Sequence, residues 1–320
     1  MPGLKDRLSD AGYGLGWSVV CWLPESWAQR AFRFVADLAW RRQGPRVRVL
    51  EGNLRRVIGS GAPAGQLRRL SRQVMRSYAR YWLEVFRLPV MPVGRLAGGM
   101  HVTGDIRAVF DHLAAGRGVI LALPHMGNYD AAGAWLIAEG AGSATVVAER
   151  LKPESVYDRF VAFREGLGME VLPASGAASS AFSILAERLR AGKLAGLVCD
   201  RDVTGRGMEV EFFGEKARMM GGAAALAVQT GAALMPVILW FEGEGWGAHI
   251  HEEIPVPAEG GGEQKAAAMM QEVARLFEAG IKAHPQDWHM LQRVFVAELD
   301  PARLAAAESA AGTGRSEGGS

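Results

Sequence analysis

The chain has few cysteines and no long uncharged apolar run. Its 320 residues include only Cys21 and Cys199, which lie far apart. That spacing argues against a disulfide framework or a zinc cluster and fits a reducing compartment. No run of about twenty uncharged apolar residues occurs, so we expect no membrane-spanning helix. Residues 11–23 come nearest, but this stretch is short, glycine-rich and without a small-residue cleavage site, so we expect no secretory signal.

Lysine is missing from one long segment that is rich in arginine. Residues 28–95 contain fifteen Arg, no Lys and three acidic residues, whereas the formal net charge of the whole chain is +2. The remaining chain is therefore acidic on balance. A basic segment suits an anionic partner, either a membrane surface or a nucleic acid. Because no nucleic-acid motif appears and tryptophans alternate with the arginines, we favour an anionic membrane surface and expect no nucleic acid. The tryptophans could equally pack on the core.

Periodicity and turn residues divide the chain. Apolar side chains recur every three or four residues over 66–87, which predicts an amphipathic helix. Prolines and glycines then cluster up to Gly99. We therefore predict a basic, Trp-rich helical region that associates with membranes (1–98) and an α/β core (99–300). A tail without periodicity (301–320) is expected to be disordered.

The core region alternates short apolar runs with helical patterns. Such alternation predicts an α/β fold with a mainly parallel central sheet and helices on both faces. Residues 249–254 could form an antiparallel edge strand. The expected strands are 101–102, 119–123, 144–148, 170–172, 194–199 and 234–240, and the expected helices are 106–115, 129–139, 155–167, 178–191, 219–229 and 263–283.

A turn at the end of the run 119–123 carries the first candidate chemistry. His125 and Asp130 stand there, separated by four residues. If the turn folds the histidine back, Asp130 could orient His125 as a general base. An ordinary polar turn with a surface histidine is the alternative. The carboxyl end of a strand in an α/β sheet is where ligand crevices form, which favours the catalytic interpretation.

Other charged residues follow neighbouring strands. Glu149 comes after the strand 144–148, and Asp200, Arg201 and Asp202 come after the strand 194–199. Taken singly they could be solvated loop charges. Their shared position at strand ends makes substrate binding equally reasonable. Arg164 stands late in the helix 155–167, where a cation complements the helix dipole.

Four blocks together resemble one enzyme family. His125-X4-Asp130 is similar to the first motif of glycerolipid and lysophospholipid acyltransferases. Cys199-Asp-Arg-Asp202, Glu211-Phe-Phe-Gly214 and His284-Pro-Gln-Asp-Trp-His289 resemble blocks of the lipid A late acyltransferase family. The resemblance covers most of the chain, up to about Leu299. Within the family, the chain resembles actinobacterial members that acylate phosphatidylinositol mannosides.

The resemblance implies an O-acyltransferase that is peripheral on the cytoplasmic face of the inner membrane. The implied donor is a long-chain acyl-CoA such as palmitoyl-CoA, used as a co-substrate, with no cofactor and no metal. The implied acceptor is a mannose hydroxyl of a phosphatidylinositol mannoside, and Arg164 would help to hold the thioester carbonyl.

Two other functions fit the same residues. Another glycolipid or a lysophospholipid could be the acceptor. A metal-dependent hydrolase could use His125, Asp130, Asp200 and Asp202 as ligands.

Overall fold

A computed structural model describes residue 17 and residues 19–149, 154–174, 180–202, 205 and 207–299. The tail 301–320 that we expected to be disordered lies outside these residues. Within the described part, no helix is both long and apolar enough to cross a membrane.

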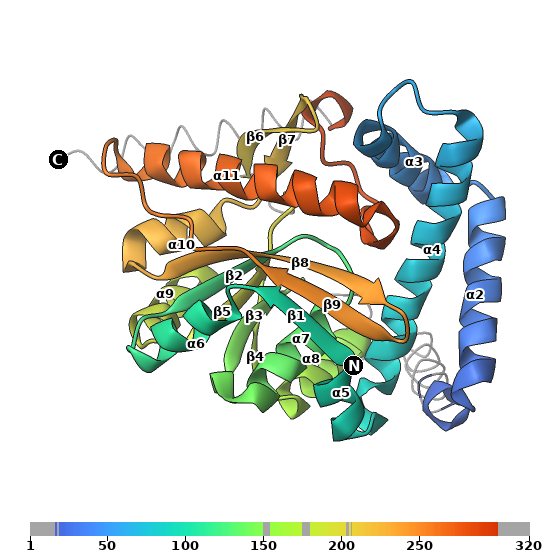
Figure 1. Ribbon diagram of the computed structural model, residues 1–320, viewed down its shortest axis with the longest axis horizontal. Helices are drawn as coiled ribbons and strands as arrows, with labels where there is room; N and C mark the ends of the chain where they lie inside the picture. Colours follow the sequence, from blue (N-terminus) through green and yellow to red (C-terminus); the bar gives the residue numbers. More distant parts are fainter. Residues whose placement is uncertain are drawn as a thin grey trace.

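A seven-stranded sheet forms the centre of the molecule, in the order β1-β9-β8-β2-β5-β3-β4 (Figure 1). Its strands are β1 (Met100–Gly104), β2 (Val119–Leu123), β3 (Ala144–Ala148), β4 (Met169–Pro173), β5 (Leu194–Val198), β8 (Ala233–Glu242) and β9 (Gly245–Ile250). All five residues of β2 are buried, as expected for a strand covered on both faces. β2 therefore lies near the middle of the sheet, between β8 and β5.

Most neighbouring strands are parallel, which confirms the predicted α/β class. β8, β2, β5, β3 and β4 pair in parallel register. β9 returns antiparallel to β8. The prediction that an antiparallel strand near residues 249–254 forms the sheet edge is wrong, because β1 pairs with the outer side of β9.

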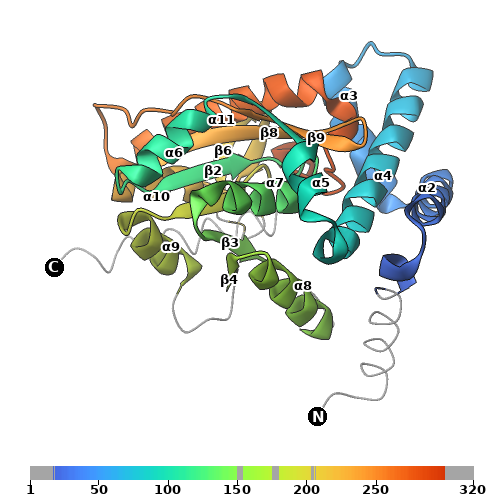
Figure 2. The same cartoon turned by 60° about the horizontal axis from the view of Figure 1, so that its bottom comes forward.

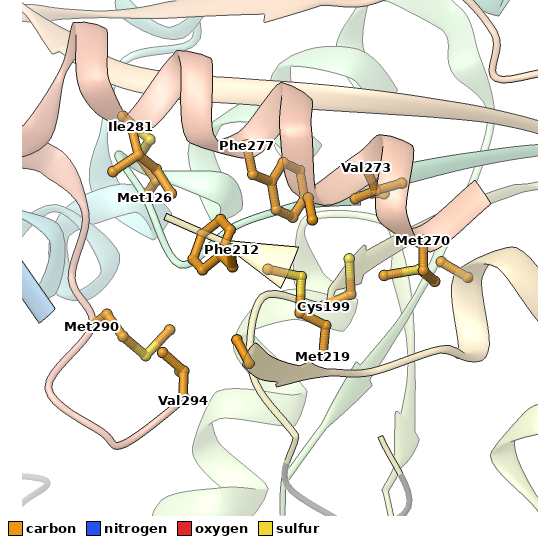
Figure 3. Close-up of a cluster of buried hydrophobic side chains, with 14 of the residues drawn as sticks. Met126, Cys199, Phe212, Met219, Met270, Val273, Phe277, Ile281, Met290 and Val294 are labelled. Atoms are coloured by element: carbon orange, nitrogen blue, oxygen red, sulfur yellow. The ribbon is translucent and has the colours of Figure 1, made fainter. Parts of the chain in front are cut away.

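Helices cover both faces of the sheet, and Figures 1 and 2 show the two layers. One layer holds α5 (Val93–Gly99), α6 (Ile106–Ala114), α7 (Tyr129–Leu136) and α8 (Glu154–Gly166), and the other holds α9 (Ala181–Arg190), α10 (Gly222–Thr230) and α11 (Gly262–Ala283). Each layer has its own apolar core. Figure 3 shows part of the core under α11, where Phe277 lies near Phe212 and Ile281 lies near Met126.

The part of the N-terminal region that the structure describes is mainly helical. It contains α2 (Glu25–Arg41), α3 (Pro45–Ile58) and α4 (Ala64–Arg87). The predicted amphipathic helix is α4, which packs against both α2 and α3. Arg72 and Arg76 both bind the Asp37 carboxylate, so some of the arginines join helices to one another. Membrane association of this region stays a prediction.

Residues 208–219 form a β-hairpin, although none of the predicted strands lies there. β6 (Met208–Phe212) and β7 (Glu215–Met219) form a two-stranded antiparallel sheet. Phe213 and Gly214 both have positive φ (51° and 76°), which suits a tight hairpin turn. The helix that we predicted from Met219 therefore begins only at Gly222. The end of β7 lies against the end of β5, because the Met220 N–H donates to the Cys199 carbonyl at 3.0 Å.

Candidate active site

His125 lies in a tight turn between β2 and α7. Asn128 caps α7, since its side chain accepts a hydrogen bond from the Ala131 N–H at 2.9 Å. Gly127 has a φ of 58°, and a Cβ added to it would lie 2.8 Å from the Leu239 carbonyl carbon. Only glycine fits this turn without displacing β8. The turn thus fixes the direction in which the chain leaves β2 and carries His125.

The carboxylate that holds His125 is Asp200, at the end of the neighbouring strand β5. The His125 Nδ1 atom lies 2.5 Å from Asp200 Oδ1, and the backbone N–H of His125 donates to Oδ2 at 2.9 Å. Asp200 has an exposed fraction of 0 %, whereas the His125 side chain is 24 % exposed. Because an ionised carboxylate only accepts hydrogen bonds, Nδ1 carries the proton and Nε2 is the basic nitrogen.

The environment keeps Asp200 ionised. Burial alone would raise its pKa, but the charge of His125 and hydrogen bonds from His125 and Trp288 hold the pKa below its usual range. The Trp288 Nε1–H donates to Asp200 Oδ2 at 2.9 Å. Asp200 is therefore a buried anion beside an accessible imidazole, the arrangement that stabilises an imidazolium during proton transfer.

Asp130 does not occupy the place that the sequence spacing suggested. The prediction that it orients His125 is wrong in its geometry, because its carboxylate binds Arg164 of α8. Arg164 donates from Nε to Oδ1 at 2.7 Å and from Nη2 to Oδ2 at 3.2 Å. Tyr81 of α4 adds a hydroxyl 2.9 Å from Oδ2. Asp130 follows the turn into the first turn of α7, and from there it faces α4 and α8.

Arg164 is a mostly buried cation that contacts the first turn of α7 through Asp130. Burial would lower its pKa, but the Asp130 charge raises the pKa above the ordinary value, so the guanidinium stays charged. Its Nε and Nη2 atoms are taken by Asp130, and Nη1 makes no hydrogen bond to any described residue. The Tyr129 ring, one residue before Asp130, lies 6.4 Å from the His125 ring. The Arg164–Asp130 pair and the His125–Asp200 pair thus flank the start of α7.

The segment 285–290 binds the His125 turn through backbone hydrogen bonds. The Gly127 N–H donates to the Asp287 carbonyl at 3.1 Å, and the His289 N–H donates to the His125 carbonyl at 2.7 Å. With the Trp288 bond to Asp200, three contacts lock the turn. We did not assign a role to these residues from the sequence, although the block 284–289 contributed to the resemblance.

Polar side chains connect the segment 285–290 to α4. The Ser77 hydroxyl of α4 donates to Asp287 Oδ1 at 2.6 Å and lies 2.8 Å from His289 Nε2. Burial and the nearby charge of His125 lower the pKa of His289 to about 3. His289 is therefore neutral at neutral pH, so it adds no positive charge beside His125 when His125 takes up a proton.

The other predicted residues lie at the same edge of the sheet but differ in their contacts. Arg201 Nη2 lies 3.2 Å from Glu149 Oε2, so the ends of β5 and β3 are joined by an ion pair with an exposed glutamate. Asp202 accepts backbone hydrogen bonds from Gly205 and Gly207, at 2.9 and 2.8 Å, and so fixes its own loop. The sequence thus predicted that these residues lie at one edge of the sheet, but it did not give the partner of each residue.

The ligand set that we considered for a metal-dependent hydrolase is not assembled. Asp130 faces Arg164, and Asp200 alone of the three aspartates contacts His125. In the described part of the chain, no three His, Cys, Asp or Glu side chains gather closely enough to hold a metal ion.

An apolar pocket opens beside the Arg164–Asp130 pair. It contains about 860 Å³ of atom-free space, including its opening, and lies between the sheet and α7. Asp130 and Arg164 line it together with apolar residues of β2, β3, β5 and β8. A mainly apolar lining suits an apolar group better than a polar one.

A second pocket is polar and lies between α2, α4 and the turn from β8 to β9. Ser77 and Asp287 line it, which places it next to the segment that holds His125. Five arginines also line it: Arg33, Arg76, Arg80, Arg87 and Arg95.

The α/β fold thus brings His125 and the buried carboxylate of Asp200 together at the carboxyl edge of the sheet. The family model for bacterial lipid A biosynthesis acyltransferase matches residues 9–296. The chain therefore belongs to that family and is an enzyme that transfers acyl groups.

Relatives extend over nearly the whole chain. A phosphatidylinositol mannoside acyltransferase of Mycolicibacterium smegmatis is 47% identical over 302 residues, which cover 94% of this chain and 96% of the relative. Proteins of the same name from two strains of Mycobacterium tuberculosis are 46% identical over 298 residues, which cover 93% of this chain and 92% of each relative.

Proposed function

We propose that this enzyme transfers a long-chain acyl group, such as palmitoyl, from acyl-CoA to a mannose hydroxyl of a phosphatidylinositol mannoside. The observation that carries the proposal is the His125–Asp200 pair, 2.5 Å apart, next to a pocket of apolar residues. The names of the relatives support the acceptor.

In the proposed reaction, His125 acts as the general base. Its Nε2 takes the proton of the mannose hydroxyl while Asp200 stabilises the resulting imidazolium. The alkoxide oxygen bonds to the thioester carbonyl carbon, and a tetrahedral oxyanion forms. When the intermediate collapses, the C–S bond breaks. The CoA thiolate then receives the proton from His125, so the products are the mannose ester and CoA with a free thiol.

Arg164 is our proposed stabiliser of the oxyanion. Its guanidinium is held by Asp130, and Nη1 has no partner among the described residues. A charged donor that is fixed before the reaction stabilises developing negative charge at little reorganisation cost. Asp130 would then position Arg164.

The acyl chain and the acceptor would occupy different pockets. Apolar residues of β2, β5 and α7 line the pocket beside Arg164 and suit a hydrocarbon chain. Five arginines line the polar pocket beside Ser77, and guanidinium groups bind phosphate well. Three of them, Arg76, Arg80 and Arg95, already pair with carboxylates, so an acceptor phosphate would share these groups.

A peripheral position on the cytoplasmic face of the inner membrane would bring both lipids to the site. Apolar side chains of α2 support membrane contact: Trp27 is 64 % exposed and Phe34 is 66 % exposed. Glu149, Arg201 and Asp202, at the strand ends near His125, remain candidates for contacts with polar parts of the substrates.

Product analysis tests the proposal. Purified enzyme is incubated with labelled palmitoyl-CoA and, separately, a phosphatidylinositol mannoside, a lipid A precursor and a lysophospholipid. Mass spectrometry should show a mannoside with one additional palmitoyl ester and stoichiometric CoA release. Preferred acylation of either other acceptor would overturn the proposed substrate.

His125→Ala should lower the acyl-transfer rate by about 10²–10⁴-fold, the usual contribution of a general base. His101→Ala removes a histidine with a 66 % exposed side chain on β1 and serves as the matched control. Acyl transfer by His125→Ala at the rate of the control would refute the mechanism.

A further inference from the structure

The apolar pocket has an open end and a closed end. In β5 the first residue, Leu194, is buried, whereas Gly196 and Val198 are partly exposed although the strand is central. β3 repeats the pattern: Ala144 is buried and Val146 is partly exposed. Gly196, Val198 and Val146 line the pocket, and the buried residues Leu194 and Ala144 line its other end. The pocket is therefore accessible at the carboxyl ends of the strands, where His125 lies, and closed at their amino ends.

Gly196 lies halfway along the pocket floor. Its partner in register on β2 is Leu121, and its partner on β3 is Val146. Both partners line the pocket. Side chains of alternate strand residues share a face, so a side chain at position 196 would project from the same face as Leu194 and Val198.

The backbone does not require glycine at position 196. Gly196 is not among the residues with positive φ, and a Cβ added there would meet only Val146 Cγ1, at an ordinary 3.6 Å. Glycine weakens a strand interior, and it often marks a place where a ligand approaches the backbone closely. What glycine provides here is open space above the middle of the floor.

Met169 closes the inner end. It is the first residue of β4, is 4 % exposed and lines the pocket. Its Cε reaches across to α7, because a Cβ added to Gly133 would lie 2.7 Å from it. Leu136 of α7 and Leu194 of β5 line the pocket near the same end.

We propose that Gly196 and Met169 set the length of the acyl chain. The chain enters at the carboxyl edge, passes over Gly196 and ends against Met169. A larger side chain at 196 would stop it halfway, and a smaller one at 169 would lengthen the pocket. This inference rests on the proposed use of acyl-CoA donors.

The test is the acyl-chain profile of variants with one lipid acceptor. Rates are measured with octanoyl-, decanoyl-, lauroyl-, myristoyl-, palmitoyl-, stearoyl- and arachidoyl-CoA. We expect Gly196→Val to lose at least about tenfold in rate with palmitoyl-CoA while keeping activity with octanoyl- or decanoyl-CoA, since single methylene groups in apolar pockets change rates by this order. Gly196→Ala should shift the optimum less. Met169→Ala should shift it toward stearoyl- and arachidoyl-CoA.

Gly61→Val is the matched control, because Gly61 is exposed and a Cβ there meets nothing within 4 Å. It should keep the wild-type profile. An unchanged profile in both Gly196→Val and Met169→Ala, or a uniform loss at every chain length in Gly196→Ala as well as Gly196→Val, would overturn the inference. A wild-type enzyme that accepts no acyl-CoA of any length would instead overturn the proposed donor.

Discussion

At the level of single residues, Asp200 and Asp130 bind different partners near His125. Asp200 contacts the imidazole directly and is fully buried, whereas Asp130 neutralises Arg164, whose side chain is 17 % exposed. Removing the charge of each should therefore have different consequences. Removing the charge of Asp200 should slow the reaction, whereas removing the charge of Asp130 should lower the free energy of unfolding.

Asp200→Asn should reduce kcat by about 10³–10⁴-fold, because an amide neither fixes the Nδ1–H tautomer nor stabilises the imidazolium. Substrate KM should change little. Steady-state kinetics measure both parameters, and a wild-type kcat would contradict the assignment of Asp200 as the partner of His125.

Asp130→Asn should lower the free energy of unfolding by about 3 kcal/mol, because it leaves a buried guanidinium without its counter-charge. Denaturant unfolding measures this value for Asp130→Asn and, as the control, for Asp111→Asn, whose side chain is 70 % exposed. If Asp130→Asn were as stable as the control, the pair would not contribute to the fold as argued.

His289 should make stability depend on pH. Its pKa in the folded protein, about 3, is below the ordinary value of 6.5, so the unfolded chain takes up this proton first. The stabilisation is fully present above pH 6.5 and is lost as pH falls toward 3, by about 1.4 kcal/mol per pH unit inside that window.

His289→Gln keeps a hydrogen-bonding group near Ser77 but cannot titrate. Unfolding in denaturant at pH 7.5, 6.5, 5.5 and 4.5 should therefore give a flatter pH dependence for this variant than for the wild type. Equal slopes would mean that His289 does not remain neutral in the folded state. The comparison between the two proteins removes the contributions of the other titrating groups.

Helix α2 is the element with the most unusual surface. Trp27, Phe34 and Val35 are all more than 60 % exposed, and their spacing puts them on one side of the helix. Arginines at 30, 33 and 41 accompany them. Aromatic side chains with nearby basic groups are typical of helices that lie in the headgroup region of a bilayer.

Replacing Trp27 and Phe34 together by Ser should weaken binding to vesicles of anionic phospholipid by at least about tenfold, because two large apolar side chains no longer enter the interface. Vesicle flotation measures the bound fraction. Val256→Ser, which changes a 37 % exposed apolar side chain on another segment, is the control. Equal flotation of the double variant and the control would contradict the membrane-contact role.

At the scale of the whole molecule, the helical N-terminal region is joined to the core by buried polar contacts. Asn53 of α3 is fully buried, and its Nδ2 donates to the carbonyls of Met290 and Gln292, each at 2.9 Å. The Met290 carbonyl belongs to the last residue of the segment 285–290 that holds the His125 turn, and Gln292 lies two residues further along the chain. The N-terminal region therefore supports the site although it contributes no group that contacts His125 among the described residues.

Asn53→Ala should lower the free energy of unfolding by about 1–3 kcal/mol, the cost of leaving buried carbonyls unpaired. We expect one cooperative transition rather than two, because the contact joins both regions. Calorimetry measures the transition, and Gln66→Ala, an exposed change on α4, is the control. Separate transitions for the two regions would contradict this view.

Local patterns in the sequence determined much of this protein. The alternation of apolar runs with helical periodicity was enough to predict the α/β class, most strands and the placement of His125 at a strand end. The hairpin of β6 and β7 also had a signal, since charged and apolar residues alternate in both strands, but the following apolar residues resembled a helix start.

The tertiary structure alone decided which carboxylate holds His125. Asp130 is near in sequence, but the first turn of α7 directs it to Arg164. Asp200 is 75 residues away in sequence, yet it lies beside His125 because β5 pairs with β2 in the sheet. The order of strands depends on how whole elements pack together, so spacing along the chain could locate the site but could not pair its residues.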